Sequence, residues 1–321
     1  MTIEDQSYQL LACGYLRSQL DALINAIEGV PRGEDIECVH KSRVATRRIR
    51  AALGIFADCF PSRRVRQWRK HIKRLTRGLG PARDKDVQIE FVERFLSELD
   101  ESNKDCQSGI ERLALRLRQQ RESFQAGVIS TLDKFEAAEI LMDMHCEIER
   151  LLFGLRRTET QLQSSFVFRH TREHIVEKYD ALRSSQSGLD DPGDKKAHHR
   201  MRIAAKKLRY VLEICNPAYE ERLSASIKTA RKLQTMLGEI HDCDVWMDFI
   251  AQFAMEEKHR TMDYFGESGP FELIEPGLIY IGRERRQRRE KTFEQLVTYW
   301  QKVKANRVWE DMLSLVEACA E

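Results

Sequence analysis

HKSRVATRRIR at residues 40–50 recurs as HRMRIAAKKLR at residues 199–209. Both segments place a histidine, an arginine, an alanine, two adjacent basic residues and a last arginine at the same spacing. Repetition of this kind predicts one architecture used twice. The 321 residues are enough for two units of ordinary size that each bury a core. We therefore expect two repeats, residues 1–160 and residues 161–321, that together form one module.

The rest of the chain has the periodicity of helices. Apolar residues recur at steps of three and four rather than alternating, and only seven prolines and sixteen glycines interrupt them. The pattern predicts an all-α protein. In the first half the expected helices span residues 5–28, 35–58, 62–79, 84–100, 105–126 and 131–155. In the second half they span residues 163–184, 195–215, 218–238, 242–260 and 278–319, the last with one break, and we expect a turn around Gly238 and a long loop from Phe265 to Gly277.

Positive charge is concentrated in the first half. Over the whole chain 53 basic residues nearly balance 51 acidic ones. The stretch from His40 to Arg77, however, holds thirteen lysines and arginines and one acid, Asp58. A segregated charge distribution predicts a basic surface despite the modest net charge, and such a surface favours a polyanionic partner.

Neither a membrane span nor a secretory signal is expected. The chain has no run of eighteen apolar residues, and it begins MTIEDQ, which lacks the basic and then apolar segment of a signal peptide. The eight cysteines are scattered without CxxC spacing, which favours reduced thiols. These features predict a cytoplasmic protein.

Each repeated segment predicts an amphipathic helix with one cationic face. His40, Arg43 and Arg47 fall on one side of the first helix, opposite its apolar residues. Like charges on one face cost about 0.2–0.5 kcal/mol per pair. A face without acids that occurs twice therefore favours a phosphate-rich ligand, held by arginine and lysine, over a merely solvated surface. The histidine that begins each face is either a helix-end residue or a donor to phosphate oxygen.

A second block is repeated as LGPARDKDV at residues 79–87 and LGEIHDCDV at residues 237–245. Its aspartates invite a metal site, and His241-Asp242 resembles the dyad of HD phosphohydrolases. The first copy argues against a metal, because Arg83 stands where the second has His241. The favoured interpretation is that the aspartates cap helices or orient neighbouring arginines.

Together these motifs resemble the CHAD domain family, named for its conserved histidines and α-helical fold. The resemblance covers nearly the whole chain and is strongest at residues 39–87 and 198–245. It implies two antiparallel helical bundles related by a pseudo-two-fold axis. Their basic helices would line a central groove or pore that binds inorganic polyphosphate.

The resemblance assigns the polyphosphate contacts to basic residues of four helices. In the first half these are His40, Arg43, Arg47, Arg48, Arg50, Lys70, Lys73, Arg74 and Arg77. In the second half they are His199, Arg202, Lys206, Lys207, Arg209, Lys228, Arg231 and Lys232. Arg48 and Lys207 point away from the histidines and are expected at the rim. Further candidates are Arg83, His241, Arg283, Arg286 and Arg289.

The resemblance implies binding without catalysis. Some relatives carry a CYTH triphosphatase domain, but its Glu-x-Glu-x-Lys signature is absent here. We expect no catalytic residue, no metal and no cofactor. The expected role is binding of polyphosphate at polyphosphate granules, with granule-associated proteins as further partners.

Two alternatives share the basic surface. Nucleic-acid binding is disfavoured because the basic faces carry few aromatic residues for base stacking. A metal-dependent phosphohydrolase would require His241, Asp242 and Asp244 to converge with His199.

Overall fold

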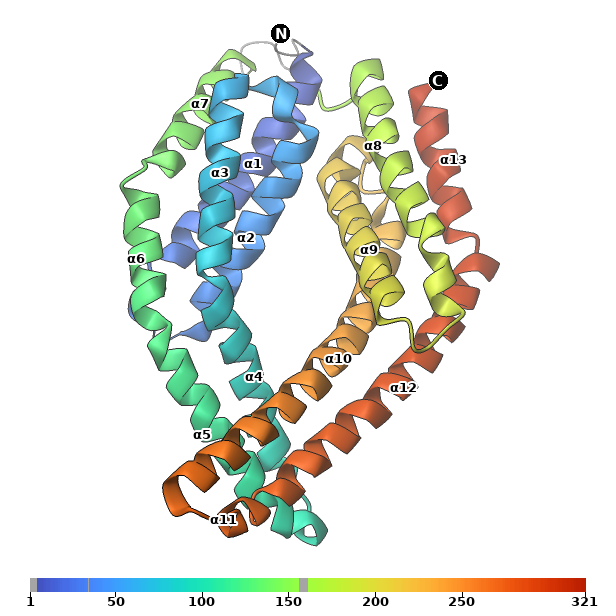
Figure 1. The fold of residues 1–321 in the computed structure, drawn as a ribbon. Helices are drawn as coiled ribbons and strands as arrows, with labels where there is room; N and C mark the ends of the chain where they lie inside the picture. Colours follow the sequence, from blue (N-terminus) through green and yellow to red (C-terminus); the bar gives the residue numbers. More distant parts are fainter. Residues whose placement is uncertain (1–4, 34, 156–160) are drawn as a thin grey trace.

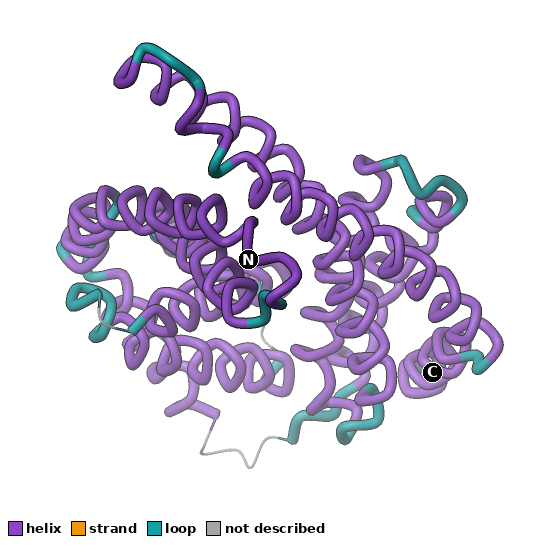
Figure 2. Tube along the Cα trace, turned by 90° about the horizontal axis from the view of Figure 1, so that it is seen from below, coloured by secondary structure: helices purple, strands orange, loops and turns teal. Residues whose placement is uncertain are grey.

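The computed structural model describes residues 5–33, 35–155 and 161–321. Within these residues the chain forms helices joined by short loops, and no strand is present (Figures 1 and 2). The prediction of an all-α protein is thus confirmed for the described part of the chain. No helix in that part is long and apolar enough to cross a membrane. All eight cysteines are free thiols.

The first half forms an upper bundle whose helices bury Leu16, Ile49 and Trp68 completely. Asp5 begins the first helix, since its side chain accepts a hydrogen bond from the Tyr8 amide at 2.8 Å. The bundle contains α1 (Gln6–Ile27), α2 (Ile36–Ile55), α3 (Ser62–Gly78), α6 (Gln125–Glu136) and α7 (Ile140–Leu155).

The second half forms the other upper bundle, on the right in Figure 1. Leu208, Leu233 and Leu296 are fully buried in it. It contains α8 (Ser165–Ser184), α9 (Lys195–Cys215), the first part of α10 (Ser224–Phe265), the last part of α12 (Glu275–Ala305) and α13 (Val308–Ala320).

Short 3-10 helices occur in both halves, at η1 (Ala57–Cys59), η2 (Glu101–Cys106), η3 (Gln186–Leu189) and η4 (Asn216–Tyr219).

A second hydrophobic core joins the two halves at the lower end of Figure 1. Leu113 of the first half and Trp246 and Ile281 of the second belong to it. A Cβ atom on Gly109 would lie 2.0 Å from the Ile274 carbonyl oxygen, so only glycine permits the backbone contact there. The helices involved are α4 (Gly80–Ser97), α5 (Gln107–Ser123), α10, α11 (Gly269–Glu272) and α12.

The two halves also meet at the upper end. The rings of Tyr8 in α1 and Phe166 in α8 lie 5.4 Å apart, and one hydrophobic core contains residues of both upper bundles. The boundary expected at residue 160 falls in the segment 156–160, outside the described residues. The division into two repeats stays a prediction.

The turn predicted around Gly238 is wrong. Residues 224–265 form one helix of 42 residues, which contains the helix expected at 242–260 and all but the first six residues of the one expected at 218–238. Pro81 explains why the first half differs, because proline lacks the amide that would continue α3 into α4. Glu239 stands in that place in the second half, so α10 continues through Gly238.

Three smaller predictions also need correction. The helix expected at 131–155 is broken between α6 and α7, where Glu139 has a φ of 50°. The helix expected to begin at residue 84 begins at Gly80. The loop expected from Phe265 to Gly277 contains α11 and the first turn of α12. The single break expected in 278–319 is confirmed, because α12 ends at Ala305 and α13 begins at Val308.

Candidate polyanion-binding site

The two repeated segments lie on helices that face each other between the two bundles. They lie on α2 and α9, which Figure 1 shows on facing sides. Burial alone would raise the pKa of Tyr210 on α9, but the proximity and charge of Arg47 on α2 lower it. Lys206 lies close enough to Arg47 and Arg202 that their charges, added to its burial, lower its pKa. Cations from both halves therefore share one site.

We call this site the central basic cluster. Its members come from the repeated helices and from the repeated block that follows each of them. They are His40, Arg43 and Arg47 on α2, Arg83 on α4, His199, Arg202 and Lys206 on α9, and His241 on α10.

On the first-half side, α2 and α4 hold three of these groups together. Burial and the charge of Arg83, followed by Arg47 and Arg43, lower the pKa of His40. Arg43 donates to the Thr76 carbonyl oxygen at 3.0 Å, so one of its nitrogens is engaged in the fold. The Arg83 Nη1 atom is buried and has no hydrogen-bond partner among the described residues.

On the second-half side, α9 and α10 bring two histidines together. The rings of His199 and His241 lie 4.7 Å apart. Burial, then the charges of Arg202 and Lys206, lowers the pKa of His199. The Nδ1 atom of His199 and the Nε atom of Arg202 are buried, and within the described ranges neither has a partner. Such groups are expected to find a partner when an anion binds.

Two carboxylates border the cluster. Asp84 lies 3.9 Å from Arg43. Asp242 is exposed to solvent. The pKa of Asp242 is raised to about 6, chiefly by loss of hydration; the charge of Arg202 opposes this shift, and the nearby Glu239 and Asp84 add to it. The first aspartate of each copy of the repeated block, Asp84 or Asp242, thus lies at the edge of the central basic cluster.

The second aspartate of each block forms a buried ion pair. Asp86 receives the Nε of Arg121 from α5 at 2.5 Å. Asp244 receives the Nε of Arg289 from α12 at 2.7 Å. The helix caps were expected at the first aspartates, Asp84 and Asp242, and this interpretation is wrong, because α4 begins at Gly80 and Asp242 lies inside α10. The alternative, that aspartates of the block orient arginines, describes the pairs of Asp86 and Asp244. Arg289, a predicted phosphate contact, is committed to this pair.

The four residues proposed for a metal site converge only in part. Asp244 is engaged with Arg289, while His241 faces His199. Across residues 5–33, 35–155 and 161–321, no three His, Cys, Asp or Glu side chains are placed to hold a metal ion together.

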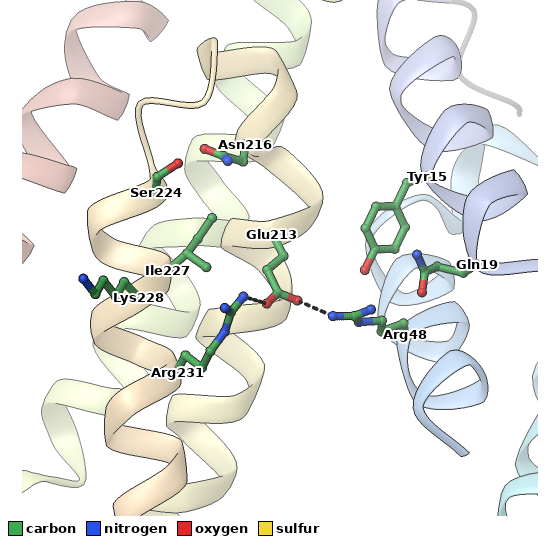
Figure 3. Close-up of a pocket in the computed structure, with 9 residues that line it drawn as sticks. All are labelled: Tyr15, Gln19, Arg48, Glu213, Asn216, Ser224, Ile227, Lys228 and Arg231. Atoms are coloured by element: carbon green, nitrogen blue, oxygen red, sulfur yellow. Dashed lines mark hydrogen bonds and ion pairs between the residues drawn. The ribbon is translucent and has the colours of Figure 1, made fainter. Parts of the chain in front are cut away.

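Three of the arginines predicted to contact polyphosphate lie beside a carboxylate. Arg48, Arg209 and Arg231 surround Glu213 at 3.4, 3.6 and 3.1 Å. Arg48, Arg231 and Glu213 border a cavity of about 570 Å³ between the bundles, which Lys228 also lines (Figure 3).

Other predicted contacts lie apart from the central basic cluster. Arg74 lines a separate pocket against α6. The Lys232 ammonium lies 4.3 Å from the Tyr299 ring on α12. Lys207 lies near Glu177 on α8, where its charge helps to lower the pKa of that carboxyl group. The exposed cations without an assigned place in the cluster are Arg50, Lys70, Lys73, Arg77, Arg283 and Arg286.

Three residues of the site were not expected from the sequence. Tyr210 follows the second repeated segment directly, where the first copy has Ala51. Glu213 lies one turn further on, where the first copy has Gly54. Tyr15 of α1 lines the cavity beside Glu213. Differences between the two copies were the available signal for Tyr210 and Glu213, whereas nothing in the sequence marks Tyr15.

Known proteins share both sequence features and fold with this chain. Among curated proteins none matches. The crystal structure of the CHAD domain from the plant Ricinus communis superposes with a TM-score of 0.59 at 19% identity, covering 97% of this chain and 91% of that one. PptA from Streptomyces chartreusis gives a TM-score of 0.61 at 15% identity, covering 91% of this chain and 99% of that one. The family model of the CHAD domain matches residues 14–251, and the chain therefore belongs to the CHAD domain family.

Proposed function

We propose that this protein binds inorganic polyphosphate, without catalysis, at the central basic cluster. The observation that carries the proposal is the approach of Arg47 on α2 to Lys206 and Tyr210 on α9. Like charges from distant parts of a chain repel each other, so their convergence favours a ligand that neutralises them. A linear chain of phosphates carries negative charge along its length and suits a row of cations on two facing helices.

The donors in the cluster fit phosphate oxygens. Arginine offers two parallel N–H donors and lysine a mobile point charge. The buried nitrogens of Arg83, Arg202 and His199 need acceptors, and phosphate oxygens would supply them. The proposed setting is the cytoplasm, at polyphosphate granules and among granule-associated proteins.

Binding should depend steeply on salt. Each neutralised phosphate of a single-stranded polyanion contributes about −0.7 to the slope of log K against log salt concentration. About five contacts therefore give a slope on the order of −3. Isothermal titration with long-chain polyphosphate and with free phosphate, from low to near-physiological salt, measures this. Equal affinity for both ligands would contradict the proposal.

The same titration separates the alternatives. If RNA displaces polyphosphate at equal phosphate concentration, nucleic acid becomes the better ligand. Release of free phosphate from bound polyphosphate, abolished by Asp242→Ala, would establish an enzyme. We expect no displacement by RNA, because the basic faces carry few aromatic residues for base stacking. We expect no release of phosphate, because Asp244 is engaged by Arg289 and not by His241 and Asp242.

Affinity should rise as the pH falls from about 7 to about 5. The pKa of Asp242 is raised to about 6, so acidification removes a negative charge from the edge of the cluster. The pKa values of His199 and His241 are lowered, so these histidines gain positive charge only in the acidic part of this range. Because the folded-state pKa of Asp242 exceeds the ordinary 3.8, its ionised form destabilises the fold at neutral pH. This cost begins to decrease as the pH falls through about 6 and is gone only below 3.8.

Titrations at several pH values, with Asp242→Asn as the comparison, measure this dependence. The variant should bind more tightly than the parent at neutral pH and show a flatter pH profile. A parent profile that falls on acidification would contradict this assignment of charges.

A further inference from the structure

Glu213 occupies the next place on the basic face of α9. His199, Arg202, Lys206, Arg209 and Glu213 follow one another at steps of three, four, three and four. Such steps place all five on one side of a helix. The corresponding place on α2 is Gly54, so only the second half ends its basic face with an acid.

The Glu213 carboxylate lies among cations from three helices. Arg231 of α10 donates to one of its oxygens at 3.1 Å and Arg48 of α2 donates to the other at 3.4 Å (Figure 3). Arg209 of α9 lies 3.6 Å away. The Glu213 side chain is only 12% exposed. Three guanidinium groups around one nearly buried anion form the kind of cradle that a phosphate group would fill.

This cradle is continuous with the central basic cluster. The Tyr15 hydroxyl is buried without a partner among the described residues, and the charges of Arg48, Glu213, Tyr210 and Arg209 act on it. Tyr210 in turn lies within reach of the charge of Arg47. The cavity of about 570 Å³ that Tyr15 and Glu213 line therefore adjoins the place where the two repeated segments meet.

The arginines around Glu213 also have hydrogen-bond donors without an acceptor among the described residues. The Nε atoms of Arg48 and Arg209 are buried, and no group in the described part of the chain accepts from them. Glu213 therefore neutralises these arginines without exhausting their capacity to bind an anion.

We propose that the negative charge of Glu213 ends the row of cations on the basic face of α9, and that it so limits the length of polyphosphate held by the protein. This inference rests on the proposed function. A phosphate chain on the central basic cluster meets the negative charge of Glu213 at the point where the next three arginines begin. To pass, the chain must displace Glu213 from all three, so it ends before them.

The test compares chain lengths in Glu213→Gln. Removing one like charge close to the ligand should raise the affinity for long-chain polyphosphate about tenfold. It should also make the salt dependence steeper and increase the number of phosphates covered per protein. Tripolyphosphate, which is too short to reach beyond the central basic cluster, should bind as it does to the parent protein.

Glu147→Gln is the matched control. Glu147 is also shared by two arginines, Arg64 and Arg150, and its side chain is 5% exposed, but it lies on α7 at the far side of the first bundle. Glu147→Gln changes the net charge by the same amount as Glu213→Gln. We expect no selective gain for long chains, and an equal gain in both variants would assign the effect to net charge and overturn the inference.

Glu213 also links α2 to α9, so the neutral variant needs a check of folding by circular dichroism. If it does not fold, Arg231→Gln is compared with Glu213→Gln/Arg231→Gln, which removes one charge of each sign. The double variant should still bind long chains more tightly than Arg231→Gln alone.

Weaker or unchanged binding of long chains in a folded variant would show that Glu213 only bridges the halves. If the parent protein itself does not bind long-chain polyphosphate, the proposed function fails as well. The two failures are thus distinguishable.

Discussion

Arg47→Ala/Lys206→Ala is expected to weaken polyphosphate binding about a thousandfold. A hydrogen bond to a charged group contributes about 1.5–3 kcal/mol, and every 1.4 kcal/mol is about a factor of ten in affinity. Arg47 and Lys206 come from opposite halves and lie within reach of each other's charge. Loss of both therefore removes the place where the two basic helices act on one ligand. Isothermal titration at near-physiological salt measures the effect.

The control removes two cations elsewhere. Lys302 and Lys304 are exposed near the C-terminal end of α12. Lys302→Ala/Lys304→Ala should change affinity by less than about threefold, because exposed charges beyond a Debye length are screened. Circular dichroism should give the same helix content for both variants. If the two double variants lose affinity equally, binding depends on total charge and not on the central basic cluster.

Asp244→Ala is expected to lower the free energy of unfolding by about 3–5 kcal/mol. Asp244 and Arg289 are 5% and 8% exposed, so removal of the carboxylate leaves a charge inside the protein. Arg289 would retain its bonds to the Pro192 carbonyl oxygen at 2.6 Å and to His198, but neither carries a compensating charge. Denaturant unfolding followed by circular dichroism measures the loss.

Asp242→Ala provides the comparison on the same helix. Its carboxylate is exposed, belongs to no buried ion pair, and is unfavourable in its ionised form at neutral pH, so its removal should not lower the free energy of unfolding. Equal losses in the two variants would contradict the different roles given to the two aspartates. The comparison also bears on catalysis, since a phosphohydrolase would need both residues for turnover.

Helical periodicity was sufficient to find most helices to within a few residues. α1, α8 and α9 follow directly from apolar residues at steps of three and four. The errors come from the ends of helices. Gly238 looked like a turn because its counterpart Gly80 precedes a proline, but a glycine alone only weakens a helix. Glu136 to Glu139 contain good helix formers, so no local signal marks the break after α6, which the packing of the bundle imposes.

The sequence predicts which cations lie on the basic faces, but not which of them contact one another. Two repeated basic faces were enough to identify the cations and to place them on two helices. Which of them meet depends on how the bundles lie against each other. Arg48 and Arg231 belong to the same predicted set as Arg47, yet they are engaged by Glu213. A side-chain partner that comes from another helix is set by the three-dimensional arrangement, which periodicity does not contain.

The lower core places a constraint on biosynthesis. Leu113 and its neighbours on α5 are covered by α10 and α12, whose residues are added to the chain more than a hundred positions later. A chain emerging from the ribosome therefore exposes this apolar surface until most of the polypeptide has been made. The lower part of the N-terminal half therefore cannot complete its core before α10 and α12 have been made.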